Sequence, residues 1–388
     1  LQMSLYGTRD AAANFQEEVR KFMVGLGFTR GKYNVSTYHH KQRKMKVLIH
    51  GDDFVSSGRR WEAKWFKEEL EKRFMVKTKI IGRSKEEEKE ATVLNRSIRV
   101  TDRGWEYEAD QRHADIIIKE LGLQEAKGVS GPGEEEKIWK VEEDAEVLKG
   151  GDDKRYRALA ARANYLALDR SDIQYPVKEI CKGMAQPTRG DLRKLRRLGR
   201  YLIEKGRVVI TFDYQGKHGE MKGFSDSDWA GCRRTAKSTS GGSIMIGKHW
   251  IKSWSSTQKN ITLSSGEAEL VAAVKMATEM IGVCQLAKDW GEDLEGQVYV
   301  DSTAALGVVN RRGCGKMRHV KVGMLWIQEK QESGELNFQK IAGTENPGDL
   351  MTKYLSGKVI ERLMEASSQT FQRGRAKTGL MIAMLWHH

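Results

Sequence analysis

The spacing of apolar residues changes near residue 208, and the chain after this point reads as strands and helices in a recognisable order. Short apolar runs come first, a long helical pattern follows at about 266–290, and strands and helices then alternate up to a last helix from about 347. The expected strands are 208–214, 221–225, 243–246, 250–254, a run near 260–263, 297–300 and 335–341. This order predicts a mixed α/β sheet with helices on both faces.

The residues before 208 predict a different organisation. Positions 46–56 alternate apolar and polar residues into and out of a tight turn, which predicts a strand, a turn and a strand. Segment 127–151, with Gly131-Pro132-Gly133 and a run of glutamates, is the strongest linker candidate. Helical periodicity occurs at 60–74, 112–121, 153–169 and 191–204.

These patterns divide the chain into four expected parts. The parts are 1–126, a linker and helical region at 127–206, the mixed sheet region at 207–358, and a weakly structured tail at 359–388.

Charge favours a polyanionic partner. The 388 residues contain 67 Lys and Arg against 53 Asp and Glu, a net charge of +14. The expected helix at 191–204 concentrates this charge, and a solvated basic face is as good an interpretation of it as a phosphate-binding face. Its candidate nucleic-acid-binding residues are Arg193, Arg196, Arg197 and Arg200.

Other features narrow the class of protein. No apolar run approaches the roughly 20 residues of a membrane span, and no secretory signal segment opens the chain. The four cysteines are far apart, which is typical of reduced thiols rather than a zinc site. Because Leu1-Gln2 is not a natural start, we expect a piece of a longer polyprotein or of a decayed gene.

Four acidic positions suggest a metal site. Asp226 lies in Phe224-Ser-Asp-Ser-Asp-Trp-Ala-Gly231 at the end of an expected strand, and Asp301 ends another. Glu269 lies on the long helix, and Asp349 begins the last one. Carboxyl ends of strands gather at one edge of such a sheet, and Mg²⁺ prefers carboxylate oxygens. The order therefore predicts a site for two Mg²⁺ ions, with Mn²⁺ as a substitute, that hydrolyses a phosphodiester.

Each of these acids has a competing interpretation. Asp228 lies two residues from Asp226 and would share its face of a continuing strand; we favour Asp226 because it is nearer the strand interior. Ser264-Ser-Gly-Glu267 fits a capping box, so Glu267 is expected to be structural and Glu269 to be the ligand. Asp349 is also what a helix N-terminus favours. Taken singly, each acid is more often structural, and only their joint order favours a cluster.

Two further candidates lie elsewhere. Adjacent Asp52 and Asp53 at the expected 46–56 turn suit a metal ion, although an aspartate-rich turn is the simpler interpretation. His319, in Lys316-Met-Arg-His319, is a candidate contact for substrate. No nucleophile elbow, dinucleotide fingerprint or phosphate-binding loop is present.

Several of these motifs together carry a resemblance. The segment containing Asp226, and also Lys237-Ser-Thr-Ser-Gly-Gly242, Leu263-Ser-Ser-Gly-Glu-Ala-Glu269 and Asp349-Leu-Met-Thr-Lys353, resembles the ribonuclease H domain of Ty1/copia-type retrotransposon Pol polyproteins. Leu5-Tyr6-Gly7 and His50-Gly-Asp-Asp-Phe54 resemble the late part of the copia-type reverse transcriptase. Segments 156–165 and 172–175 resemble its connecting region. The resemblance covers roughly residues 1–358.

The resemblance implies a fold and a set of site residues. It implies a partial polymerase palm with a helical thumb or connection, followed by a ribonuclease H-like mixed five-stranded sheet with flanking helices. Asp226, Glu269, Asp301 and Asp349 match the family's ribonuclease H carboxylates. Asp52 and Asp53 match two of three polymerase metal ligands; the third belongs to an earlier motif that this chain lacks, so we expect no polymerisation by this chain alone. No histidine stands in 341–347, before the last carboxylate.

The resemblance also implies a function. It implies two-metal hydrolysis of the RNA strand of RNA/DNA hybrids, within a Pol polyprotein whose other parts are partners. No membrane and no small-molecule cofactor is expected, and the expected location is intracellular, in a cytoplasmic virus-like particle or the nucleus. The alternatives are a catalytically decayed nucleic-acid-binding fragment and an RNA-directed DNA polymerase completed by the missing motifs.

Overall fold

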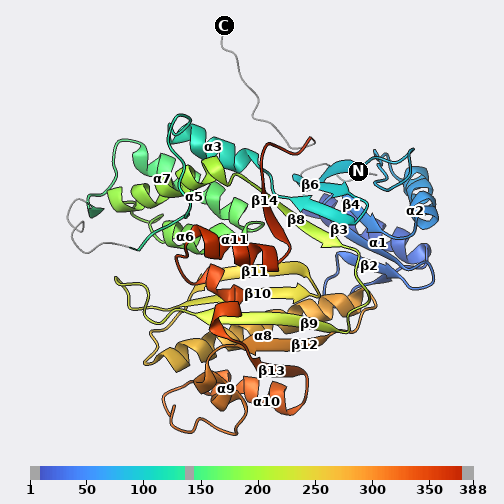
Figure 1. Cartoon of the computed structure of the whole chain (residues 1–388). Helices are drawn as coiled ribbons and strands as arrows, with labels where there is room; N and C mark the ends of the chain where they lie inside the picture. The colour runs from blue at the N-terminus through green and yellow to red at the C-terminus, as the bar shows by residue number, and fades with distance from the viewer. Residues whose placement is uncertain (1–8, 136–143, 378–388) are drawn as a thin grey trace. The chain divides into compact units, whose positions relative to one another are not determined.

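The computed structural model describes residues 9–135 and 144–377 (Figure 1). The chain forms two compact units. One consists of Leu1–Glu88 with Ile281–Leu294, and the other of Lys89–Met280 with Glu295–His388. The motif Leu5-Tyr6-Gly7 and the end of the expected tail, 378–388, lie outside the described residues.

The first unit is a four-stranded antiparallel sheet in the order β1-β2-β3-β4, with two helices packed on it. Val19 and Met23 of one helix and Phe66 and Leu70 of the other enter a core with Val47 of the sheet. The expected strand, turn and strand at 46–56 is confirmed, because β3 pairs with β4 across a tight turn. The elements are α1 (Arg9–Gly25), β1 (Thr29–Arg30), β2 (Thr37–His40), β3 (Met45–His50), β4 (Asp53–Ser57) and α2 (Arg60–Arg73).

The second unit begins with an antiparallel sheet in the order β14-β8-β7-β6-β5 and a group of helices. The helices bury a continuous apolar cluster that includes Ile117, Tyr156, Leu166 and Leu198. The elements are β5 (Glu90–Val93), β6 (Arg96–Val100), β7 (Gly104–Glu108), α3 (Arg112–Glu120), α5 (Asp152–Ala167), η2 (Ser171–Ile173), α6 (Gln174–Cys181), α7 (Arg189–Glu204) and β8 (Arg207–Asp213).

A second, mixed sheet in the same unit has the order β11-β10-β9-β12-β13. β9, β10 and β11 are antiparallel, whereas β12 runs parallel to both β9 and β13. The mixed α/β class agrees with the apolar pattern, and the five strands agree with the sheet that the family resemblance implies. The elements are β9 (Glu220–Ser227), β10 (Thr239–Ile246), β11 (His249–Thr257), α8 (Ser265–Asp289), β12 (Glu295–Val300), α9 (Thr303–Val309), η3 (Val322–Leu325), α10 (Trp326–Glu332), β13 (Leu336–Lys340), η4 (Gly343–Glu345), η5 (Pro347–Met351), α11 (Gly357–Ala366) and β14 (Gln369–Gln372).

Glycine lets two elements approach the mixed sheet closely. A Cβ at Gly241 of β10 would lie 2.6 Å from Thr352 and 2.9 Å from Met351, so only glycine admits the η5 segment here. A Cβ at Gly223 of β9 would lie 2.6 Å from the sulfur of Met276 in α8.

Helix α8 is long and apolar enough to span a membrane, with a mean hydropathy of 1.5, but the core helix of a globular protein can have the same length and composition.

The strand pairing differs from the sequence prediction in two places. The strand expected at 208–214 forms as β8, but it pairs with β7 and β14 and not with the mixed sheet. An apolar strand pattern specifies a buried face and not a partner, so this choice depends on long-range packing. Residues 260–263, expected as a strand, form no strand and lead directly into α8.

The prediction of a weakly structured tail is wrong for residues 359–377. Most of α11 lies in this segment, and its Ile360, Leu363 and Met364 are buried against Val208 and Ile210. β14 then adds an edge strand to β8. The apolar residues of α11 repeat at helical spacing, and the helix is held because that face covers the sheet.

Candidate active site

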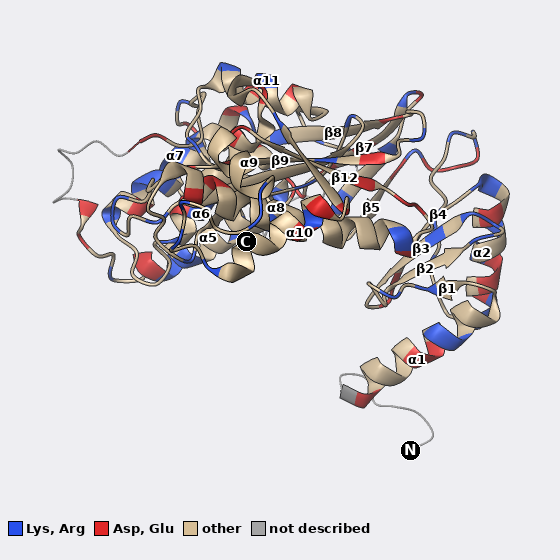
Figure 2. Ribbon diagram, turned by 90° about the horizontal axis from the view of Figure 1, so that it is seen from below, with Lys and Arg blue, Asp and Glu red and all other residues tan. Residues whose placement is uncertain are grey.

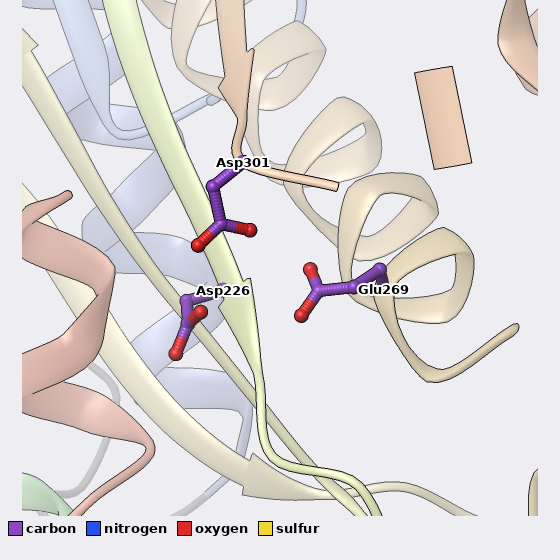
Figure 3. A group of neighbouring side chains, drawn as sticks. All are labelled: Asp226, Glu269 and Asp301. Carbon is purple, nitrogen blue, oxygen red and sulfur yellow. The ribbon is translucent and has the colours of Figure 1, made fainter. Parts of the chain in front are cut away.

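Three carboxylates come together at one edge of the mixed sheet. Asp226 lies near the end of β9, Asp301 directly follows β12, and Glu269 lies in the second turn of α8. One ligand oxygen of each lies within 4.8 Å of one oxygen of each of the others. Figure 3 shows the three carboxylates directed toward a shared space. The parallel pairing of β9 with β12 brings Asp226 and Asp301 to the same edge.

Asp226 is almost completely buried, with 1% of its side chain exposed. Its Oδ2 accepts the hydroxyl of Thr352 and lies 3.3 Å from the ammonium of Lys353. Its Oδ1 has no hydrogen-bond partner among the described residues. Burial raises the pKa of Asp226 to about 7, against the opposing effect of Lys353 and with a further rise from Asp349.

Glu269 is held by the residue next to Asp226. Its Oε1 accepts the backbone N–H of Ser227 at 3.1 Å and the Ser227 hydroxyl at 2.9 Å. Its Oε2 is buried and has no hydrogen-bond partner in the described chain. Burial raises the pKa of Glu269 to about 8, and the nearby Asp226 and Asp301 add to the rise.

Glu267 has the structural role expected of it. Its backbone N–H donates to Ser264 Oγ at 3.2 Å, and its Oε2 accepts the backbone N–H of Leu263 at 2.7 Å. In a standard capping box the Glu267 carboxylate would accept the backbone N–H of the cap residue, Ser264. Here it accepts the N–H of the preceding residue, Leu263, so the box is a variant of the expected one. This local network fixes the start of α8 and thereby the position of Glu269.

Asp349 lies beside the triad and outside it. In the described ranges, the group of acids close enough to share a metal ion contains Asp226, Glu269 and Asp301 and not Asp349. Asp349 Oδ1 instead accepts a hydrogen bond from Lys353 at 2.5 Å. The preceding Gly348 packs on the site, since a Cβ there would lie 2.8 Å from the Cβ of Asp226. Asp349 therefore reaches Asp226 through Lys353.

The triad suits a divalent cation. Asp226 Oδ1 and Glu269 Oε2 are buried carboxylate oxygens without a donor, and leaving them so is costly unless a cation meets them. With Asp301 they form an all-oxygen ligand set, which is what Mg²⁺ and Mn²⁺ prefer. These three residues could hold a metal ion.

Asp52 and Asp53 occupy a different environment. Both are exposed at the β3–β4 turn, where Gly51 has a φ of +62°. No third acid, histidine or cysteine joins them at metal-binding distance among residues 9–135 and 144–377. The pair matches the expected turn, and its role as a metal site stays a prediction.

The arginines of α7 all have partners within the chain. Arg193 pairs with Asp144, Arg197 with Glu134 at 2.8 Å, and the carbonyls of residues 121 and 127 accept from Arg196 and Arg200. Figure 2 marks the Lys and Arg positions along this helix. These arginines therefore already have partners within the chain although Arg193 and Arg196 are exposed, and their nucleic-acid role stays a prediction.

His319 lies near the start of α8. Its Nε2 is 3.0 Å from Glu267 Oε2, and 43% of the side chain is exposed. Lys316, Arg318 and Lys321 around it are also exposed. Its contact with substrate is untested.

Sequence reasoning missed three residues that shape the site. Ser227, Thr352 and Lys353 each contact Asp226, Glu269 or Asp349. All three lie inside the motifs around Asp226 and Asp349, so their position in the sequence was the available clue.

Comparison with known proteins identifies relatives over most of the chain. The chain is 26% identical over 363 residues to a retrovirus-related Pol polyprotein from transposon RE1 of Arabidopsis thaliana, covering 92% of this chain and 24% of that protein. It is 24% identical over 379 residues to the Pol polyprotein from transposon TNT 1-94 of Nicotiana tabacum, covering 94% of this chain and 28% of that protein. An uncharacterized mitochondrial protein of Arabidopsis thaliana is 32% identical over 171 residues, 44% of this chain and 68% of that protein. No family model matches.

A solved structure gives a weaker likeness. A foamy viral protease-reverse transcriptase in complex with RNA/DNA hybrid aligns at a TM-score of 0.48 and 12% identity, covering 87% of this chain and 39% of that one. The chain spans about a quarter of the length of the Pol polyproteins it matches. The sequence relationships confirm the resemblance, and the chain belongs to the copia-type, retrovirus-related Pol polyproteins of transposons.

Proposed function

We propose that the site at Asp226, Glu269 and Asp301 hydrolyses the RNA strand of RNA/DNA hybrids with bound divalent metal. One observation carries the proposal: three carboxylates from β9, α8 and β12 converge, and two of them present buried oxygens without a donor. Such an arrangement is stable when a cation satisfies the oxygens. Membership of the Pol polyprotein family and the ribonuclease H-like motifs around these acids support hydrolysis of nucleic acid as the use of that cation.

Different residues would bind each of the two metal ions. Asp226, Glu269 and Asp301 would bind the first ion, and Asp226 with Asp349 would contribute to the second ion that the sequence predicts. Mg²⁺ ions in such a site activate water and neutralise charge on the departing 3′ oxygen. Ser227 keeps Glu269 turned toward Asp226, and Thr352 fixes the other oxygen of Asp226. Rigid ligands of this kind lower the reorganisation that metal binding requires.

We further propose that the loop after β9 holds the nucleic-acid backbone. This loop, residues 228–238, begins two residues after Asp226 and carries Arg233 and Arg234, both exposed. Neither side chain has a hydrogen-bond or ion-pair partner within the described residues, unlike the arginines of α7. Trp229 in the same loop is 54% exposed, with its indole N–H donating to the Thr262 carbonyl. Free guanidinium groups and an exposed aromatic ring in the loop that follows Asp226 suit a polyanion with sugars and bases.

A substrate comparison tests the proposal. The full chain would be incubated with a labelled RNA/DNA hybrid, double-stranded RNA and double-stranded DNA of one sequence, with Mg²⁺ and with chelator. We expect cuts in the RNA strand of the hybrid only, and only with Mg²⁺. Equal cutting of all three duplexes, or cutting in excess chelator, would contradict the proposal.

A further inference from the structure

Lys353 links two of the four carboxylates that the sequence assigns to metal binding. Its Nζ lies 2.5 Å from Asp349 Oδ1 and 3.3 Å from Asp226 Oδ2. Asp226 is 1% exposed and Lys353 is 43% exposed, so the lysine reaches a buried carboxylate from the surface. In this structure the ammonium is the cation that Asp226 and Asp349 share.

The two oxygens of Asp226 face different partners. Oδ2 accepts the Thr352 hydroxyl and pairs with Lys353, whereas Oδ1 lacks a hydrogen-bond partner among the described residues. The position bounded by Asp226, Glu269 and Asp301 is therefore distinct from the position between Asp226 and Asp349. The first has oxygens without donors, and the second already has a cation.

A divalent ion bound between Asp226 and Asp349 would need the oxygens that Lys353 now contacts. The two cations cannot use these oxygens together, because like charges repel at contact distance. Lysine has a flexible four-carbon stem, so its ammonium can withdraw to solvent when a stronger cation arrives. The result is competition for the second position without a permanent block.

We infer that Lys353 is a positioning residue that holds the second cation position of the site, so that the chain takes up one divalent ion readily and a second only by displacing the ammonium. The inference rests on the proposed function and deepens it, since it sets the order in which cations enter. It also explains the placement of Asp349 outside the triad: its partner in the metal-free chain is a side chain just beyond the same η5 segment.

Metal counting tests the inference without measuring activity. Mn²⁺ would be titrated into the full chain by calorimetry, with electron paramagnetic resonance to detect coupled Mn²⁺ pairs. The wild-type chain should bind one ion tightly and a second weakly. Lys353→Met should bind the second ion about tenfold more tightly, as expected if roughly 1.4 kcal/mol of competing interaction is removed. Coupled pairs should then appear at lower Mn²⁺ concentration.

Three variants make the result specific. Lys353→Gln should repeat the effect of the methionine variant, and Lys353→Arg should restore wild-type binding because the positive charge returns. Lys358→Met, at an exposed lysine of α11, is the matched control and should match wild type. Circular dichroism would verify that each variant is folded.

The outcomes separate this inference from the proposed function. If Lys353→Met and Lys353→Gln bind the second ion as wild type does, the inference is overturned and the triad site stands. If no variant binds any Mn²⁺, both the inference and the proposed metal site fail. If the lysine variants behave as expected but no hybrid is cut, the inference holds and hydrolysis is refuted.

Discussion

Glu269 on α8 is bound through one carboxylate oxygen to both the backbone N–H and the hydroxyl of Ser227 on β9. Ser227 is the neighbour of Asp226, so a single residue sets the spacing between two candidate metal ligands. The other oxygen of Glu269 is left without a hydrogen-bond partner in the described structure. The Ser227 contacts therefore orient Glu269 so that its second oxygen is available to a cation.

Replacing Ser227 by alanine should weaken metal binding and stability together. The variant removes one hydrogen bond to Glu269 and keeps the backbone one, so we expect a decrease of about 1 kcal/mol in unfolding free energy. Mn²⁺ affinity should fall several-fold because Glu269 gains rotational freedom. Urea unfolding and Mn²⁺ titration measure the two effects.

Ser225→Ala is the matched control two residues earlier on β9. The Ser225 hydroxyl is buried and makes no hydrogen bond within the described residues. Removing an unsatisfied hydroxyl should leave stability unchanged or slightly increased. Equal decreases in Ser225→Ala and Ser227→Ala would show that the strand tolerates no change and that the Ser227–Glu269 contact has no special role.

Asp226→Asn should strongly slow hybrid cleavage, and Asp228→Asn should not. Asp226 belongs to the triad, whereas Asp228 accepts the Thr239 backbone N–H through Oδ1, a contact that asparagine can also make. We expect Asp226→Asn to slow cleavage by roughly 10²-fold or more, the scale for removal of one electrostatic contact to reacting groups. Single-turnover cleavage of a labelled hybrid in Mg²⁺ measures both rates. Similar rates for Asp226→Asn and wild type would refute the assignment.

The contribution of Asp226 and Glu269 to the stability of the metal-free chain should decrease as pH rises from about 4 to 8. Burial raises the pKa of Asp226 to about 7 and that of Glu269 to about 8. Between their ordinary values near 4 and these values, the folded chain binds more protons than the unfolded chain. Their contribution is therefore fully present below about pH 4 and is lost as pH rises through about 7 and 8.

Thermal unfolding in chelator at pH 5.5 and pH 8.5 measures this change. Asp226→Asn with Glu269→Gln removes both titrations and should flatten the pH dependence relative to wild type. Mg²⁺ should stabilise wild type more at pH 8.5 than at pH 5.5, because ligand carboxylates must be deprotonated. Equal stabilisation by Mg²⁺ at both pH values would contradict the raised pKa values.

The convergence of the triad could be predicted from the sequence because backbone topology places it. Asp226 and Asp301 stand at the ends of parallel strands, and Glu269 follows a readable helix start. The carboxyl ends of neighbouring parallel strands meet at one edge of a sheet whatever their side chains are. The count of five strands was expected only from the ribonuclease H resemblance, because the apolar pattern alone indicated two further strands, at 208–214 and 260–263, that do not join this sheet.

The ion-pair partners of charged side chains could not be predicted from the sequence. Lys353 pairs with Asp226, which lies in a distant part of the sequence, and Arg197 pairs with Glu134 across 63 positions. Such pairs depend on the approach of whole elements, which local patterns do not encode. The pairing of β8 with β7, and the burial of α11 on β8, were missed because each needs a partner from another part of the chain.

Breaking a buried ion pair in the helical part of the second unit should be strongly destabilising. Arg170 is 1% exposed and its pair with Asp172 measures 2.6 Å. Tyr201 also donates to Asp172 at 2.9 Å. Asp172→Ala would leave a buried guanidinium without its carboxylate, which typically costs about 3–5 kcal/mol. Urea unfolding measures the decrease.

An exposed ion pair supplies the comparison. Arg103 is 78% exposed in its pair with Asp213, so Asp213→Ala should cost at most about 1 kcal/mol. If Asp172→Ala costs no more than Asp213→Ala, the buried pair contributes nothing beyond a surface interaction. A large decrease in the stability of Asp172→Ala with normal Mn²⁺ binding would show that stability and the metal site are separable.

Arg233 and Arg234, and not the arginines of α7, should govern affinity for nucleic acid. The first two have no partner among the described residues, whereas Arg193 and Arg197 already pair with acidic side chains. Removing one arginine–phosphate interaction lowers the dependence of log affinity on log salt by about 0.7–0.9. Arg233→Ala with Arg234→Ala should therefore weaken hybrid binding and lower the salt slope by roughly 1.5.

Arg193→Ala with Arg197→Ala is the matched control, because it removes the same charge from α7 and should change binding little. Fluorescence anisotropy with a labelled hybrid at low and moderate salt, in chelator to prevent cleavage, compares the two double variants. Both double variants lose the same positive charge, so a general effect of net charge would decrease their affinities equally. Equal decreases would contradict a binding surface at the loop 228–238. A greater decrease in the α7 variant would instead show that nucleic acid displaces the acidic partners of that helix.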